Sequence, residues 1–137
     1  YWVVTLALVS SGPLGSDLKP FSSDGCSSFP DGTNTQRALW LECCTAHDFA
    51  YWQGGSYQQR LDSDRVLQHC VADLGQEEIS FLMLAAVRVG GSPFFPTKFR
   101  WGYGWPYPKL YGELSDQERN QIDTLTGEAE KPARQQP

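Results

Sequence analysis

Hydrophobic residues in the middle of the chain recur every three or four positions, which is the spacing of a helix with one apolar face. Two stretches show this pattern, and their stripes are Leu61, Leu67, Val71 and Leu74, and Ile79, Leu82, Met83 and Ala86. Ser56 and Gln59 form a capping box, so the first helix is expected from Ser56 to about Leu74. The second is expected over 77–89, where a Gly-Gly pair stops it.

A further helix is expected on each side of this pair. One runs over 35–53, with Asn34 or Thr35 as its cap and a Gly-Gly pair at its end. The other begins at the capping box of Ser115 and reaches about Leu125. Because only a very short link follows the helix over 35–53, that helix and the next are expected to form an antiparallel hairpin. The predicted fold class is mainly α.

The segments outside these helices divide the chain into one domain and two ends. Residues 20–34 are dense in Ser, Gly, Pro and Asp, and so long an irregular stretch often marks a functional loop. Residues 1–20 begin with an apolar run like the end of a secretory signal, followed by a GPLGS string like the remnant of a cleaved tag. We therefore expect a single domain over 21–125 and a disordered polar tail over 126–137.

Charge and cysteine content narrow the class of protein. The formal net charge is −5, which disfavours nucleic acid and anionic membranes as partners. The apolar run at the start is too short to cross a bilayer, so no transmembrane span is expected. Four cysteines in so small a domain indicate two disulfides and a secreted or periplasmic location. We expect a monomer, and a zinc site built from Cys and His is the alternative use of the cysteines.

The helix over 35–53 carries the residues with candidate chemistry. On a helical wheel Cys43 and His47 share one face, and Cys44 and Asp48 share the next, about 100° around. Neighbouring cysteines do not pair readily with each other. Two connectivities therefore remain. Cys44 is the natural partner of Cys26 in the irregular loop, and that bridge would lay the loop against the face that carries Asp48.

A bridge of this kind predicts a cation site. Asp24, Asp31 and several loop carbonyls would then lie near the Asp48 carboxylate. Irregular, oxygen-rich backbone with a carboxylate is what a hard cation such as Ca²⁺ requires. Calcium is therefore the predicted cofactor.

The remaining bridge places an acid opposite the histidine. Cys43 pairs with Cys70 in this scheme, which brings Asp64 opposite His47 in the antiparallel hairpin. Asp64 also lies on the apolar stripe of its helix, where a carboxylate needs a partner. Asp62 points about 160° away from Asp64 and is expected to be solvated.

A histidine base, an orienting carboxylate and a cation are the parts of metal-assisted ester hydrolysis. His47 takes a proton from water in this scheme. Asp64 fixes the imidazole tautomer and stabilises the imidazolium. The cation polarises the carbonyl.

Three motifs resemble the secreted phospholipase A2 superfamily, and they are closest to its bacterial and fungal branch. The first is the active-site helix string CCTAHDFAYW, and the second is DRVLQHC, in which an Asp precedes a Cys by six residues. The third, SSDGCSSFPDG, resembles the calcium loop of that branch. The resemblance covers about 22–70. It implies a disulfide-linked antiparallel helix pair with a calcium-binding loop and an additional helix.

The resemblance also implies an activity and a set of site residues. The activity is calcium-dependent hydrolysis of the sn-2 ester of glycerophospholipids at a membrane or micelle interface. His47 is the base, Asp64 supports it, and Tyr51 matches a tyrosine that hydrogen-bonds the supporting Asp. The implied calcium ligands are Asp48, Asp24 and the Gly25 carbonyl, and the implied bridges are Cys26–Cys44 and Cys43–Cys70.

These residues also have interpretations other than an enzyme. A non-catalytic relative that binds calcium or protein is the alternative function, but the presence of both His47 and Asp64 favours catalysis. His69 is expected at the surface, and Arg100 as a phosphate contact is weakly supported. The aromatic residues near the C-terminal third are more typical of core cover than of a membrane belt. They are Phe94, Phe95, Trp101, Tyr103, Trp105 and Tyr107.

Overall fold

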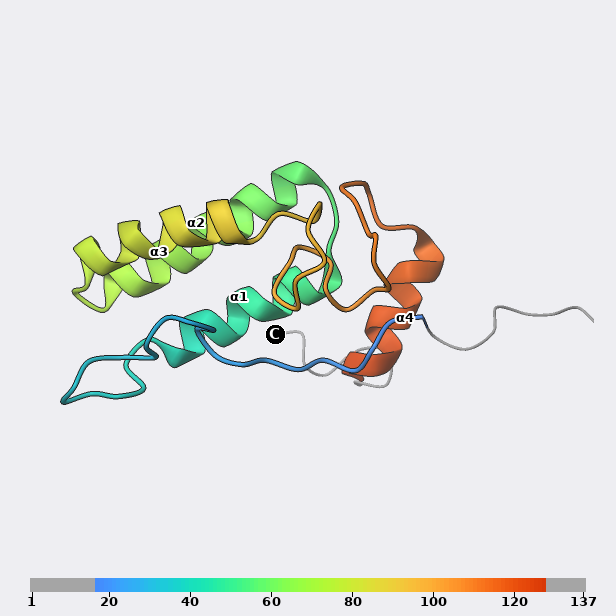
Figure 1. Cartoon of the computed structure of the whole chain (residues 1–137). Coiled ribbons are helices and arrows are strands. Elements are labelled where there is room, and N and C mark those ends of the chain that lie inside the picture. Colours follow the sequence, from blue (N-terminus) through green and yellow to red (C-terminus); the bar gives the residue numbers. More distant parts are fainter. Residues whose placement is uncertain (1–16, 128–137) are drawn as a thin grey trace, which may run out of the picture.

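The computed structural model describes residues 17–127, and within them it contains four α-helices and no strand (Figure 1). The helices are α1 (Leu41–Gln53), α2 (Tyr57–Asp73), α3 (Glu77–Gly90) and α4 (Asp116–Thr126). The mainly α class is confirmed. Thr126 closes α4, and the rest of the predicted tail lies outside the described residues apart from Gly127. No helix in the described part is long and apolar enough to cross a membrane.

Both predicted capping boxes are present. The Ser56 hydroxyl accepts the Gln59 backbone N–H at 3.1 Å, and the Gln59 side chain accepts the Ser56 N–H at 2.8 Å. Ser115 and Glu118 make the same reciprocal pair at the start of α4. These bonds satisfy N–H groups that would otherwise lack partners, so α2 and α4 begin where the sequence predicts.

Helix α1 begins six residues later than the predicted start at residue 35. The Thr33 hydroxyl accepts the Gln36 N–H at 3.0 Å, and the Trp40 N–H donates to the Asp31 carbonyl at 3.0 Å. These local bonds hold the segment before Leu41 in turns and compete with helical pairing. Neither Asn34 nor Thr35 is the cap, so that part of the prediction is wrong.

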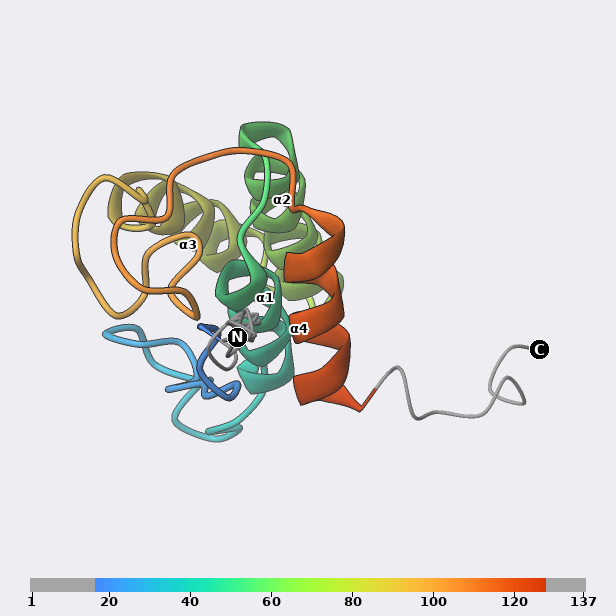
Figure 2. The same ribbon diagram turned by 90° about the vertical axis from the view of Figure 1, so that its right-hand side faces the viewer.

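Helices α1 and α2 are antiparallel and linked by a disulfide. Three contacts join them at successive levels, and they are Cys43–Cys70, His47–Asp64 and Tyr51–Arg60. Residue numbers rise along α1 as they fall along α2, which confirms the predicted hairpin. Gly54 and Gly55 make the short link with φ values of +71° and +134°, which favour glycine. Helix α3 lies beside α2, as both ribbon views show (Figures 1 and 2).

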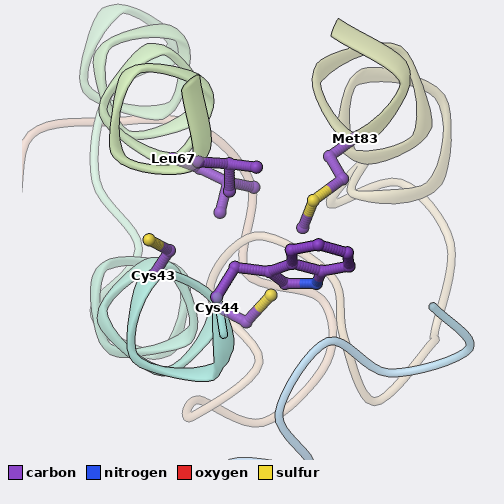
Figure 3. Packing of buried hydrophobic residues seen from close by; sticks show 6 residues of the cluster. Cys43, Cys44, Leu67 and Met83 are labelled. Atoms are coloured by element: carbon purple, nitrogen blue, oxygen red, sulfur yellow. The ribbon is translucent and has the colours of Figure 1, made fainter. Parts of the chain in front are cut away.

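The first hydrophobic cluster lies between α1, α2 and α3. Figure 3 shows Leu67 and Met83 pointing from α2 and α3 toward the two cysteines of α1. On α3 the buried face differs from the predicted stripe of Ile79, Leu82, Met83 and Ala86. Leu82 is 55% exposed, and Ala86 is also exposed. Helix α3 is apolar around most of its circumference, so its contact with α2 selects which residues are covered.

A second cluster lies on the other side of α1, where α4 packs (Figure 2). It consists of Leu18, Trp52, Trp105 and Ile122. Leu18 is only 3% exposed, and the Lys19 N–H donates to the Gly104 carbonyl at 2.9 Å. The packed structure therefore extends back beyond the boundary expected at residue 21, because an apolar side chain there covers Trp52.

Candidate active site

His47 and Asp64 meet between α1 and α2. His47 Nε2 lies 2.8 Å from Asp64 Oδ1, both residues are buried, and Asp64 is 0% exposed. Because a carboxylate only accepts, Nε2 is the nitrogen that carries the hydrogen. Nδ1 makes no hydrogen bond to any described residue and is therefore the nitrogen available as a base.

Two further donors reach the Asp64 carboxylate. The Tyr51 hydroxyl donates to Oδ1 at 2.7 Å, and Arg88 Nε donates to Oδ2 at 2.8 Å. Burial, followed by the nearby charge of Asp64, raises the pKa of Tyr51 well above its usual value, so the phenol remains a donor. With three donors the buried carboxylate is satisfied, which offsets the cost of its removal from water.

Arg60 connects this network to the end of α3. Its Nε donates to the Tyr51 hydroxyl at 2.9 Å, and a terminal nitrogen donates to the carbonyls of Val87 and Arg88 at 2.9 and 2.8 Å. Those carbonyls belong to the last turn of α3, and the Val87 carbonyl also accepts the Gly91 N–H at 2.9 Å. Another nitrogen donates to the Tyr111 hydroxyl at 2.6 Å.

The sequence reasoning missed both arginines. The signal for Arg60 was its position one helical turn before Asp64, a spacing that places two side chains on the same face. The signal for Arg88 was a single basic residue in the last turn of an apolar helix. Neither signal indicates which acid the arginine meets.

Both disulfides pair as predicted, Cys26 with Cys44 and Cys43 with Cys70. No cysteine is left free, so there is no thiolate for the alternative zinc site. The Cys26–Cys44 bridge holds the irregular loop against α1 on the side of Asp48.

The loop supplies hydrogen bonds and negative charge to Asp48. The Ser23 hydroxyl donates to Asp48 Oδ2 at 2.7 Å and accepts the Gly25 N–H at 3.1 Å. Burial raises the pKa of Asp48 to about 6; the bond from Ser23 lowers it, and the charge of nearby Asp24 adds to the rise. Asp48 is thus a half-buried carboxylate whose charged form is disfavoured mainly by its burial, although nearby His47 also lowers its pKa.

Asp31 shapes the same loop. Its Oδ1 accepts the Cys26 N–H at 3.0 Å, and a Cβ placed on Gly25 would lie 2.7 Å from that oxygen. Gly25 also has a φ of +69°, so the loop requires glycine at this position on both counts. Asp24 Oδ1 accepts the Ser27 hydroxyl at 2.9 Å.

The residues predicted to hold calcium fit a hard cation in ligand type and charge. Within residues 17–127 neither Asp48 nor Asp24 forms an ion pair with Lys or Arg. The same part of the chain contains no group of three or more His, Cys, Asp or Glu side chains that could hold a metal. Backbone carbonyls and water would have to supply the remaining ligands, as they commonly do for Ca²⁺.

A pocket of about 250 Å³ opens beside the His47–Asp64 pair. His47 and Asp48 both line it, and the Cys26–Phe29 segment forms part of its wall. Its apolar lining from α2, α3 and the segment after α3 consists of Leu67, Met83, Ala86, Val87 and Phe99. Among residues 17–127 no Lys or Arg lines this pocket. A mostly apolar pocket with a few ionisable groups is the usual form of a small-molecule site.

The segment after α3 contributes structure more than chemistry. Arg100 is buried and donates to the carbonyls of Thr97 and Trp105 at 2.8 Å, so it is not available for a phosphate. Trp101 and Trp105 are buried, as expected for core cover. Tyr103 is partly covered, and the remaining aromatic residues of the predicted set, Phe94, Phe95 and Tyr107, are exposed. His69 and Asp62 lie at the surface, as predicted.

Comparisons with protein-family models, with curated proteins and with solved structures found no match. The fold and the site together define a small, mainly helical protein with two disulfides and a buried His–Asp pair beside a mostly apolar pocket. Any more specific function has to be argued from the chemistry of that site.

Proposed function

We propose that the protein is a calcium-dependent hydrolase of the sn-2 ester of glycerophospholipids, of the secreted phospholipase A2 type. The observation that carries the proposal is the 2.8 Å contact between His47 and Asp64 beside a pocket that Asp48 also lines. The disulfide-linked helix pair and the second bridge to an acidic loop agree with the fold that the sequence resemblance implies.

His47 acts as the general base. Its Nδ1 takes a proton from a water molecule while the water oxygen attacks the ester carbonyl carbon. Asp64 accepts the hydrogen bond from the Nε2 N–H and stabilises the imidazolium that forms. The imidazolium then returns the proton to the oxygen of the leaving alcohol as the carbon–oxygen bond breaks. Tyr51 holds Asp64 through its 2.7 Å hydrogen bond.

Asp48, Asp24 and the Gly25 carbonyl are the proposed calcium ligands. Support comes from the raised pKa of Asp48, about 6, because a desolvated carboxylate beside a second acid is relieved by a cation. When bound, calcium would polarise the ester carbonyl and stabilise the negative charge that develops on its oxygen.

The pocket and the charge of the chain suggest the class of substrate. Since Leu67, Met83, Val87 and Phe99 line the pocket, an acyl chain is the natural occupant. The net charge of −5 favours a neutral or zwitterionic lipid surface over an anionic one. Two disulfides fit an extracellular compartment, and we propose that the protein acts there.

Replacing the base tests the proposal. His47→Ala should lower fatty-acid release from phospholipid micelles by about 10²–10⁴-fold, the usual contribution of a general base. His69→Ala is the matched control, because His69 is exposed and should leave turnover unchanged. Unchanged release by His47→Ala, with circular dichroism showing a folded protein, would exclude His47 as the base.

A further inference from the structure

We propose that Arg88 is a positioning residue of the site. In this view it holds the Asp64 carboxylate so that Oδ1 faces His47 and the imidazole keeps its hydrogen on Nε2. The expected effect of Arg88 on kcat rests on the proposed function, whereas its effect on which His47 nitrogen carries the hydrogen does not. Arg88 lies on α3, outside the part of the sequence that carries the three motifs.

The two oxygens of Asp64 have separate partners. Oδ1 accepts from His47 and Tyr51 at 2.8 and 2.7 Å, whereas Oδ2 accepts from Arg88 Nε at 2.8 Å. A carboxylate rotates readily about its last side-chain bond, since that torsion is broad and two-fold. A donor on Oδ2 therefore resists rotation of the whole group and keeps Oδ1 turned toward the imidazole.

Attachment of α3 is served by other contacts. Arg60 donates to the carbonyls of Val87 and Arg88, and Met83 fills the cluster between α1, α2 and α3. The Arg88 guanidinium has only two acceptors among the described residues, Asp64 and the Leu61 carbonyl, the latter at 3.3 Å.

The charges around Asp64 make the role of Arg88 specific. His47 and Tyr51 face the carboxylate from α1, and Arg60 reaches it only through the Tyr51 hydroxyl. Arg88, from α3, is therefore the one arginine in the described part of the chain that contacts the carboxylate directly. Its side chain is 31% exposed, so it lies at the edge of the network and not inside it.

The test compares Arg88→Gln and Arg88→Lys with Arg65→Gln, which removes an exposed charge from α2. Nitrogen-15 spectra of the imidazoles report which ring nitrogen carries the hydrogen. The chain has two histidines, so the His69→Ala variant assigns the signals. Fatty-acid release from zwitterionic phospholipid micelles gives kcat and KM, and calorimetry gives the calcium affinity.

Arg88→Gln should give a mixed population of His47 tautomers. Its kcat should fall about ten- to hundredfold, by analogy with the loss found when the hydrogen-bond partners that orient metal-ligating side chains are removed. KM and calcium affinity should stay within about twofold, Arg88→Lys should recover part of kcat, and Arg65→Gln should match the unmodified protein.

A single Nε2–H tautomer and an unchanged kcat in Arg88→Gln would overturn the proposal. If Arg88→Gln does not fold, Arg88→Lys provides the test. The lysine nitrogen would lie at a different position from Arg88 Nε and should still change the population of His47 tautomers. An unchanged population in Arg88→Lys would overturn the proposal. A tautomer shift in a protein without hydrolytic activity would uphold the positioning role and refute the proposed function alone.

Discussion

Two neighbouring glycines at the end of α3 are placed in different environments. A Cβ on Gly91 would lie 2.6 Å from a ring carbon of Tyr51 and 2.7 Å from its hydroxyl oxygen. A Cβ on Gly90 would meet only Phe99, at 3.9 Å. Gly91 therefore allows the close approach of Tyr51 to the backbone, and with it the hydrogen bond from Tyr51 to Asp64.

This contrast gives a prediction at the residue scale. Gly91→Ala should lower the free energy of unfolding by about 1–3 kcal/mol, because an added methyl group in a packed site forces its neighbours apart. Gly90→Ala, one position away, should change it by less. Urea unfolding of the two variants measures the difference, and equal stabilities would contradict the packing described around Tyr51.

Individual residues differ in how far the sequence alone could predict them. His47, Asp64 and Tyr51 come together as expected, because helical spacing and one hairpin relate their positions. Arg60 and Arg88 could not be assigned in the same way. Their partners depend on how α3 and the segment that contains Tyr111 pack against α1 and α2, and those contacts follow from the tertiary fold.

At the scale of elements, the sequence predicts helix starts well where a side chain caps them. Ser56 and Ser115 begin α2 and α4 as expected. Helix α1 starts later than the sequence predicts, because the Thr33 hydroxyl accepts the Gln36 N–H and holds that segment in a turn. The covered face of α3 was predicted only in part, since a helix that is apolar around most of its surface does not indicate which side its neighbours cover.

The two disulfides connect different elements, so their removal should have different effects. Replacing Cys43 and Cys70 by Ala should cost about 2–5 kcal/mol of stability, as for native bridges in small secreted domains, because it frees α1 from α2. Replacing Cys26 and Cys44 should mainly weaken calcium binding, because that bridge holds the loop near Asp48.

Chemical unfolding and calorimetry on both double variants measure these effects. If loss of Cys26–Cys44 left the calcium affinity unchanged, the loop would not be part of the metal site. If loss of Cys43–Cys70 left the midpoint of unfolding unchanged, the bridge would not stabilise the hairpin.

The whole molecule combines a hairpin that carries the His47–Asp64 pair with a loop that carries negative charge. α4 and the segment after α3 cover the far side of α1 through Trp52, Trp105 and Ile122, so the hairpin is supported on two faces. The pocket lies between the loop and α3, where an apolar chain would meet both His47 and Asp48. We therefore expect the proposed hydrolysis and calcium binding to depend on each other.

The most direct measurement of this dependence is fatty-acid release from a phospholipid with different labels on its two acyl chains, with calcium and with a chelator. We predict release of the sn-2 chain in calcium and its loss with chelator. The Asp48→Asn variant should need at least about tenfold more calcium for half-maximal release. This corresponds to a loss of about 1.4 kcal/mol in the free energy of calcium binding, which is a factor of ten in affinity. Undiminished release in chelator, or no release at saturating calcium, would contradict the account.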